Sequence, residues 1–472
     1  MDTPAATKQP FRAIVVGGGP VGLTLAHTLA QANIDFELLE ARDTVFADEG
    51  ASIILYPGGL AHLRAAGHLG CRPGGIVSDE VGPGRDLGRQ VRPRFDRPVD
   101  HKRSAFHRRD LVKMLHDTLD SGSQKRIHTG KKVVDIQSTS EGVTVHCADG
   151  TTFDGSIVIG ADGVHSKTRG FMRNLALKAA ASDPGVKVNP EKPYTASYRC
   201  MVQLKPNPPI PRPHILPALP LGNYPTAPTD PSAGENHDCH GPKLSSMVIY
   251  GPERSWFFMY EQLDQPTQER RDYTEADMEQ YAQQFSQMHL TDGVRFEDVW
   301  PKRQGAGMSD LYEGMVEHWH HGRVVLCGDA AFKVTPNIGW GYNSGSHSVV
   351  ALTNRLHDLV HNRDDTSAPP TTQQLSKAFA EYGRERRADL GLVQILSSFA
   401  TRQQAWPVNG GGWIYKMAEK LMNLMPSLET FMIWNVGIKA QQNGRMLDFV
   451  RFGEDPCKSA AAPWIYPYPT KG

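Results

Sequence analysis

Residues 12–22 read RAIVVGGGPVG, and this stretch decides the fold. The β-branched run at its start is typical of a buried parallel strand, both faces of which are covered by helices. The glycine-rich turn leads into residues 23–32, LTLAHTLAQA, which predict a helix. A second apolar strand is expected at residues 36–40, FELLE. Together these segments predict a βαβ unit of about 30 residues.

The glycines of this turn, Gly17, Gly19 and Gly22, have the spacing G-x-G-x-x-G. Glycines at these positions allow a tight turn and a close approach of the backbone to a pyrophosphate at the positive end of the helix. Glu40 ends the second strand, where a carboxylate accepts hydrogen bonds from a ribose. The combination favours dinucleotide binding. The alternative is a glycine turn that only packs strand against helix.

Composition excludes several other classes of protein. The 472 residues include 51 Lys and Arg and 51 Asp and Glu, so the formal net charge is zero. Binding of nucleic acid through the overall charge of the chain is therefore not expected. The six cysteines form no C-x-x-C pair, which is typical of a reduced intracellular protein. No apolar run is long enough to span a membrane, and residues 421–438 are interrupted by Pro426, Glu429 and Asn435. We expect a cytoplasmic protein, with contact to the surface of an intracellular membrane as the alternative and the oligomeric state left open.

Further chemistry-bearing blocks follow along the chain. They are residues 160–166 (GADGVHS), 323–331 (RVVLCGDAA) and 336–343 (PNIGWGYN). In order and spacing these blocks resemble the class A FAD-dependent monooxygenases, which have the p-hydroxybenzoate hydroxylase fold. Residues 49–53 (EGASI), 198–200 (YRC) and 333–337 (KVTPN) resemble the fungal secondary-metabolite branch, which includes paxilline-type epoxidases and indole-alkaloid monooxygenases.

The resemblance implies an α/β fold, with a Rossmann-like FAD-binding domain, an inserted β-sheet substrate domain and a helical C-terminal extension. The FAD-binding domain is expected to be discontinuous, over residues 1–75, 100–175 and 295–372. The substrate domain is expected over residues 76–99 and 176–294, with a proline-rich insertion at 204–243. The helical region is expected at 373–472.

The resemblance also assigns cofactor-binding residues. Glu40 would hold the adenosine ribose, Ile54 would make a backbone contact to FAD, and Arg108 would face the pyrophosphate, with adjacent Arg109 as the alternative. Asp329 would accept from the ribityl hydroxyls, and the turn from Gly339 through Tyr342 would direct helix amides at the flavin. Asp162 is linked to FAD and to the visiting nicotinamide, and its alternative role is to cap a helix. The sequence departs from the family at Phe332, Trp340 and the pair His347-Ser348, all expected beside the flavin ring.

The resemblance implies FAD as the bound cofactor, NADPH or NADH as a transient reductant and O2 as co-substrate. Reduced flavin and oxygen give a C4a-hydroperoxide, which the protein must keep away from water. Arg199 is the candidate catalytic residue, and its alternative is a structural salt bridge. Trp256, Phe257 and Phe258 could line an apolar pocket or simply belong to the core.

We expect oxygen transfer to a hydrophobic alkaloid or terpenoid, as an alkene or indole 2,3-epoxidation that could be followed by rearrangement to a spiro-oxindole. The alternatives are a phenol hydroxylase and, from another class, a non-catalytic flavin-binding regulator. The halogenase motif W-x-W-x-I-P does not occur in the sequence. No metal site is expected, because the spacing within His237-Asp238-Cys239-His240 matches no standard zinc pattern.

Overall fold

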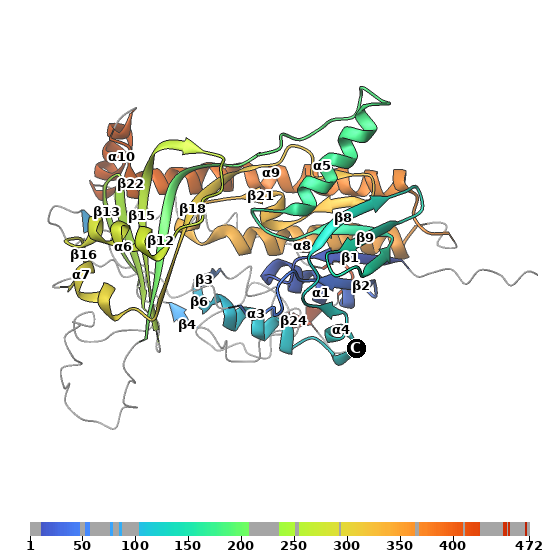
Figure 1. The fold of residues 1–472 in the computed structure, drawn as a ribbon, viewed down its shortest axis with the longest axis horizontal. Helices are drawn as coiled ribbons and strands as arrows, with labels where there is room; N and C mark the ends of the chain where they lie inside the picture. Colours follow the sequence, from blue (N-terminus) through green and yellow to red (C-terminus); the bar gives the residue numbers. More distant parts are fainter. Residues whose placement is uncertain are drawn as a thin grey trace, which may run out of the picture.

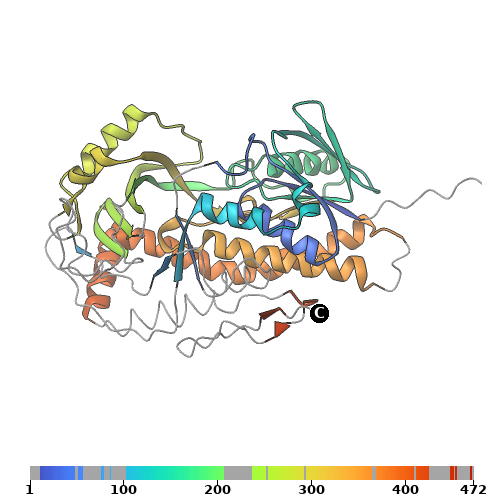
Figure 2. The same cartoon turned by 90° about the horizontal axis from the view of Figure 1, so that it is seen from below.

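The computed structural model describes residues 11–47, 52–56, 76–78, 85–86, 103–206, 236–250, 254–291, 294–363, 368–408, 411–424, 447–450, 452–453 and 468–469 (Figures 1 and 2). Glu49, Gly50 and Ala51 of the EGASI block lie outside these ranges. So do residues 207–235 of the expected insertion and most of the apolar segment 421–438.

The first sheet is the expected Rossmann-like one, in the strand order β19-β20-β11-β1-β2-β7. Its strands are β1 (Arg12–Val16), β2 (Asp35–Leu39), β7 (Ile127–His128), β11 (Ile157–Gly160), β19 (His320–His321) and β20 (Val324–Leu326). All of its pairings are parallel except that of β19 with β20. Helix α1 (Pro20–Gln31) connects β1 to β2 and packs against both. The carboxyl ends of parallel strands lie at one edge, so the motif loops that follow β1, β11 and β20 meet there.

The second sheet is larger and lies apart from the first (Figure 1). It follows the order β21-β18-β12-β15-β14-β13-β22, with β5 also paired to β13. Its strands are β5 (Arg85–Asp86), β12 (Thr195–Pro206), β13 (Asn236–Pro242), β14 (Leu244–Tyr250), β15 (Arg254–Thr267), β18 (Gly305–Met315), β21 (Phe332–Lys333) and β22 (Ala405–Trp406). We call its two faces the outer face, which α6 (Glu275–Phe285) and α7 (Phe296–Val299) cover, and the inner face, which packs against Ala105 and Ile54.

Smaller elements complete the described part of the chain. They are the sheets β3 (Ser52–Leu55)–β6 (Arg103–His107)–β4 (Ile76–Ser78), β10 (Thr152–Gly155)–β9 (Val143–Cys147)–β8 (Val133–Ser138), β16 (His289–Thr291)–β17 (Val294–Arg295) and β23 (Phe452–Gly453)–β24 (Tyr468–Pro469), the helices α3 (Arg108–Asp117), α4 (Ser121–Gln124) and α5 (Lys167–Ala180), and the 3-10 turns η1 (Trp300–Lys302), η2 (Gly328–Ala330) and η3 (Pro336–Ile338).

Three late helices follow, α8 (Trp340–His361), α9 (Thr372–Gln404) and α10 (Gly412–Leu424), and of these α9 contacts strands of both sheets. Helix α9 runs from the first sheet to the second (Figure 1), and its 33 residues give a rod of about 50 Å. Helices α8 and α9 lie side by side (Figure 2). Buried Arg386 of α9 fixes this contact by donating to Ser344 O at 3.2 Å and Ser348 Oγ at 3.1 Å.

The predicted α/β class is confirmed, and the predicted strands and helices are found with small shifts at their ends. The predicted insertion 204–243 is too wide, because β12 continues to Pro206 and β13 begins at Asn236. Prolines near strand ends are compatible with pairing, since only an interior proline removes a ladder hydrogen bond. The domain boundaries stay a prediction.

Candidate active site

The glycine loop after β1 forms a tight turn at the start of α1. Gly17 has φ +110°, which favours glycine, and its amide donates to Leu39 O at 2.8 Å. A Cβ on Gly22 would lie 1.8 Å from Gly17 O, whereas one on Gly19 would meet nothing closer than Arg108 Nη2 at 3.9 Å. The loop therefore has no room for a side chain at Gly22, whereas the space next to Gly19 is open.

Glu40 is held beside this loop by backbone amides. Its side chain is buried, with Oε2 accepting from Gly18 N at 2.7 Å and Oε1 accepting from Arg42 N at 3.0 Å. Each carboxylate oxygen has a second lone pair available for a ribose hydroxyl. The position fits the predicted contact, which stays a prediction.

The second motif lies directly against the first. A Cβ on Gly17 would come within 2.6 Å of Ala161 O, so the loops after β1 and β11 are in contact. The carboxylate of Asp162 accepts from Ser166 Oγ at 2.5 Å, Thr168 N at 2.9 Å and Thr168 Oγ1 at 3.0 Å. These bonds satisfy the first turn of α5, as the capping alternative anticipated. A role toward the cofactor remains a prediction.

The third motif, residues 328–331 after β20, also contacts the glycine loop. The conformation of Gly328, with φ +62°, favours glycine, and a Cβ there would lie 3.0 Å from Val21 Cγ1 of the glycine loop. Asp329 follows, and its carboxylate is paired with Lys333 Nζ at 2.6 Å. Sequence analysis did not foresee this pair, although the i,i+4 spacing is visible in the chain. The ribityl contact predicted for Asp329 stays a prediction.

Ile54 and the start of α8 meet at the same place. Asn343 Nδ2 donates to Ile54 O at 2.8 Å, and its Oδ1 accepts from Tyr56 N at 3.0 Å. Tyr342 is buried, and its hydroxyl shares a hydrogen bond of 2.9 Å with Thr24 Oγ1 of α1. Burial raises the pKa of Tyr342 to about 12. The amide side chain of Asn343 therefore joins β3 to α8, a role that the sequence did not reveal.

Two adjacent arginines, Arg108 and Arg109, begin α3. Arg108 is half-buried, with its guanidinium toward Gly19, whereas Arg109 is exposed. This placement supports Arg108 over Arg109 as the group that faces a pyrophosphate. A guanidinium fork suits phosphate oxygens.

These residues fit FAD. Helix α1 begins with Pro20 after Gly19, has no side-chain cap at its N-terminus and carries no acidic residue in its first turn. Its first amides and its dipole are therefore available to an anion, and the open space at Gly19 admits a pyrophosphate. The departures from the family, Phe332, Trp340 and His347, are all buried, and Trp340 Nε1 has no hydrogen-bond partner within the described residues.

The inner face of the large sheet lies against this site. Its apolar cluster includes Trp256 and Phe258, which are buried as the core alternative describes, and Ile54 packs on it. A role of these two residues in lining a pocket stays a prediction. Phe257 is on the outer face, because side chains alternate along β15. No three His, Cys, Asp or Glu residues gather into a metal site in the described part of the chain, and His237–His240 belong to β13 rather than to a loop.

The candidate catalytic residue Arg199 forms an ion pair with a residue of the neighbouring strand. Its Nε and Nη2 bond Glu261 Oε2 at 2.8 and 2.7 Å, and its guanidinium lies 5.0 Å from the ring centroid of Tyr281 in α6. It is thus on the outer face, as the salt-bridge alternative describes, and does not face the flavin side. A register shift between Ala196 and Tyr198 separates the start of β12 from this part of the strand. A catalytic role for Arg199 stays a prediction.

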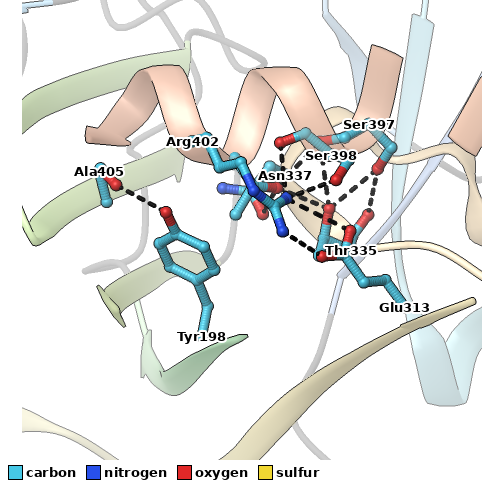
Figure 3. Close-up of polar contacts among 9 residues, drawn as sticks. Tyr198, Glu313, Thr335, Asn337, Ser397, Ser398, Arg402 and Ala405 are labelled. Carbon is cyan, nitrogen blue, oxygen red and sulfur yellow. Dashed lines mark hydrogen bonds and ion pairs between the residues drawn. The ribbon is translucent and has the colours of Figure 1, made fainter. Parts of the chain in front are cut away.

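Helix α9 connects the turn before α8, which contains Thr335, to the large sheet (Figure 3). Arg402 pairs with Glu313 of β18 at 2.6 Å, and its guanidinium lies 5.8 Å from the ring centroid of Tyr198. Thr335, just before η3, shares hydrogen bonds with Ser397 Oγ at 2.9 Å and Thr401 Oγ1 at 2.6 Å. We call this network the α9 clamp. The KVTPN block marked Thr335, but its partners on α9 gave no sequence signal.

Comparisons with known proteins agree with this arrangement. A family model described as the FAD binding domain matches residues 11–173 and 234–368. The chain is 30% identical over 464 residues to the FAD-dependent monooxygenase srdH of Neurospora crassa, covering 94% of this chain and 96% of srdH. It is also 30% identical to the FAD-dependent monooxygenase DEP2 of Alternaria brassicicola, over 90% of this chain and 76% of DEP2.

Solved structures show the same fold. Native FqzB aligns with a TM-score of 0.66 at 18% identity, over 91% of both chains. HpxO of Klebsiella pneumoniae, complexed with FAD and uric acid, aligns with a TM-score of 0.64 at 18% identity, over 92% of this chain and 97% of HpxO.

Proposed function

The chain belongs to the FAD-binding family of flavin-dependent monooxygenases, and from this premise we propose that it transfers one oxygen atom to an alkene or indole 2,3-bond of a hydrophobic alkaloid or terpenoid. The observation that carries the proposal is the meeting of three distant motifs at the start of α1, beside an apolar sheet face. An apolar face favours an uncharged substrate. The related family members are named as monooxygenases, which favours an enzyme over the regulator alternative.

Different parts of the site would serve cofactor binding and substrate binding. Bound FAD, reduced by NADPH or NADH, would supply the activation of dioxygen. The α1 amides and Arg108 would hold the pyrophosphate of FAD, and the N-terminus of α8 would stabilise negative charge on the reduced flavin ring. The inner-face aromatic residues exclude water and hold the substrate, while the α9 clamp fixes the sheet relative to the turn before α8.

A spectrum and a turnover assay test this proposal. The purified protein is expected to show the visible absorption of bound flavin, and NADPH oxidation in air is expected to increase at least tenfold when an accepted indole is present. The product should contain one added oxygen atom, which mass spectrometry measures. A colourless protein that does not take up added FAD would refute the proposal. Turnover of phenols alone, or only a hydroxylated and unrearranged indole, would favour the aromatic hydroxylase alternative.

We also propose that α10 contacts an anionic membrane surface. In the described part of the chain, no helix combines the length and apolarity needed to cross a membrane. The side chains of α10 at positions i, i+1, i+4 and i+8 are instead strongly exposed: Trp413, Ile414, Met417 and Leu421. Lys416 and Lys420 flank this apolar arc and would pair with lipid phosphates.

Vesicle sedimentation tests the α10 proposal. The double substitution Trp413→Glu with Met417→Glu is expected to reduce binding to phosphatidylserine-containing vesicles more than tenfold, because two apolar side chains no longer enter the interface. Leu177→Glu is the matched control, since Leu177 is an exposed apolar residue on α5. Equal binding by both variants, or no binding by the unmodified protein, would contradict the proposal.

A further inference from the structure

Two hydroxyl groups lie side by side on the inner face of the large sheet. Ser245 of β14 and Tyr260 of β15 are directly paired across the strands, so their side chains point to the same face. Ser245 is 1% exposed and Tyr260 is 0% exposed. Neither Ser245 Oγ nor the Tyr260 hydroxyl has a hydrogen-bond partner within the described part of the chain.

Two other buried tyrosines that pack on this sheet have hydrogen-bonded hydroxyls. Tyr198, on the same face, donates its hydroxyl to Ala405 O at 2.9 Å. Tyr281, which lies against the outer face, donates to Met259 O at 3.0 Å. Buried hydroxyls are normally satisfied in this way, because an unmatched polar group loses its hydration without compensation. Two unmatched groups on paired residues therefore point to a ligand.

The surroundings define the chemistry of that ligand. Tyr260 stacks on Phe258 with ring centroids 6.3 Å apart, which fixes the direction of its hydroxyl. Burial, reinforced by Cys200 and Asp238, raises the pKa of Tyr260 well above its usual value, so the phenol stays protonated and can donate. The nearby carboxyl of Asp238 disfavours an anionic oxygen. A neutral carbonyl or hydroxyl oxygen satisfies both conditions.

We propose that Ser245 and Tyr260 form a polar subsite that binds a neutral oxygen of the otherwise apolar substrate and so selects which double bond faces the flavin. This inference rests on the proposed function, because it names a group of the substrate of that same site. The subsite binds and orients; it takes no part in the oxygen transfer itself.

A matched pair of indoles tests the subsite. We expect the unmodified protein to bind 3-(3-oxobutyl)indole about tenfold to a hundredfold more tightly than 3-butylindole, which lacks the carbonyl. Tyr260→Phe is expected to remove most of this preference, and Ser245→Ala part of it, with little effect on 3-butylindole. Tyr281→Phe is the control, and it should leave the preference unchanged. An unchanged preference in Tyr260→Phe, or no preference in the unmodified protein, would overturn the subsite.

Thermal unfolding decides the question without turnover. Because the Tyr260 hydroxyl has no hydrogen-bond partner among the residues that the structure describes, Tyr260→Phe is expected to leave the unfolding midpoint unchanged or raise it. Tyr281→Phe should lower the midpoint, because it removes a hydrogen bond that the protein makes. A lowered midpoint in Tyr260→Phe would mean that the hydroxyl is satisfied internally, which contradicts the subsite. Failure of the proposed function would appear separately, as absence of bound FAD or of NADPH oxidation with every indole.

Discussion

Gly22→Ala is expected to yield no folded protein with bound flavin, whereas Gly19→Ala is expected to fold and still fail to retain FAD. The new methyl at position 22 would lie 1.8 Å from Gly17 O and 3.0 Å from Gly17 C, and these backbone atoms cannot turn away as a side chain could. At position 19 the methyl meets only the flexible end of Arg108 at 3.9 Å, so the fold tolerates it. It would, however, occupy the space into which a pyrophosphate must come.

The measurements are thermal unfolding of the apoprotein and titration with FAD. For Gly19→Ala we expect an unchanged midpoint and an FAD dissociation constant raised at least about a hundredfold, since several hydrogen bonds to phosphate are lost together. Gly170→Ala is the control, because a Cβ there meets nothing within 4 Å on α5. Normal FAD affinity in Gly19→Ala would show that the pyrophosphate lies elsewhere, and a normally folded Gly22→Ala would contradict the described turn.

Arg402→Met is expected to cost about 2–3 kcal/mol of unfolding free energy. It leaves Glu313, whose side chain is 14% exposed, without its ion pair, and it removes the guanidinium next to Tyr198. Because the pair is not fully buried, the cost should lie below that of a fully enclosed one. Urea unfolding measures it, and adding Glu313→Gln should recover part of the loss in a double-mutant cycle.

Arg355→Met is the control for the clamp. Arg355 of α8 forms an ion pair with Glu385 of α9 at 3.0 Å, but its side chain is 39% exposed. An exposed pair contributes less than about 1 kcal/mol. Equal losses in Arg355→Met and Arg402→Met would mean that the clamp has no special role in holding the sheet.

The Rossmann-like unit was predictable because local chemistry and global fold agree there. The β-branched run, the glycine spacing and Glu40 all predict the same βαβ unit, and the structure brings them together. Arg199 shows the opposite case. Along a strand, a one-residue shift exchanges the two faces, and the irregularity between Ala196 and Tyr198 is not visible in the sequence. Its orientation could therefore not be derived.

The polar contacts of α9 were also beyond prediction, for a different reason. A periodic apolar pattern predicts a helix, but it does not reveal which distant loop the helix will touch. In the sequence, Ser397 and Thr401 are ordinary helix positions. Their role follows only from the folded structure, in which they bond Thr335, more than 60 residues earlier in the chain. Likewise, the pairing of Ser245 with Tyr260 depends on strand register, which only the assembled sheet defines.

The continuity of α9 has a consequence for directed evolution of this protein. One unbroken rod carries contacts to the turn before α8 and to the large sheet, so a substitution near Ser397 or Arg402 reaches both at once. A substitution selected at these positions for a new substrate would then also change how tightly the coenzyme is bound. Substrate preference and coenzyme binding would therefore change together. Variation on the strands of the large sheet, away from the rod, would allow them to be separated.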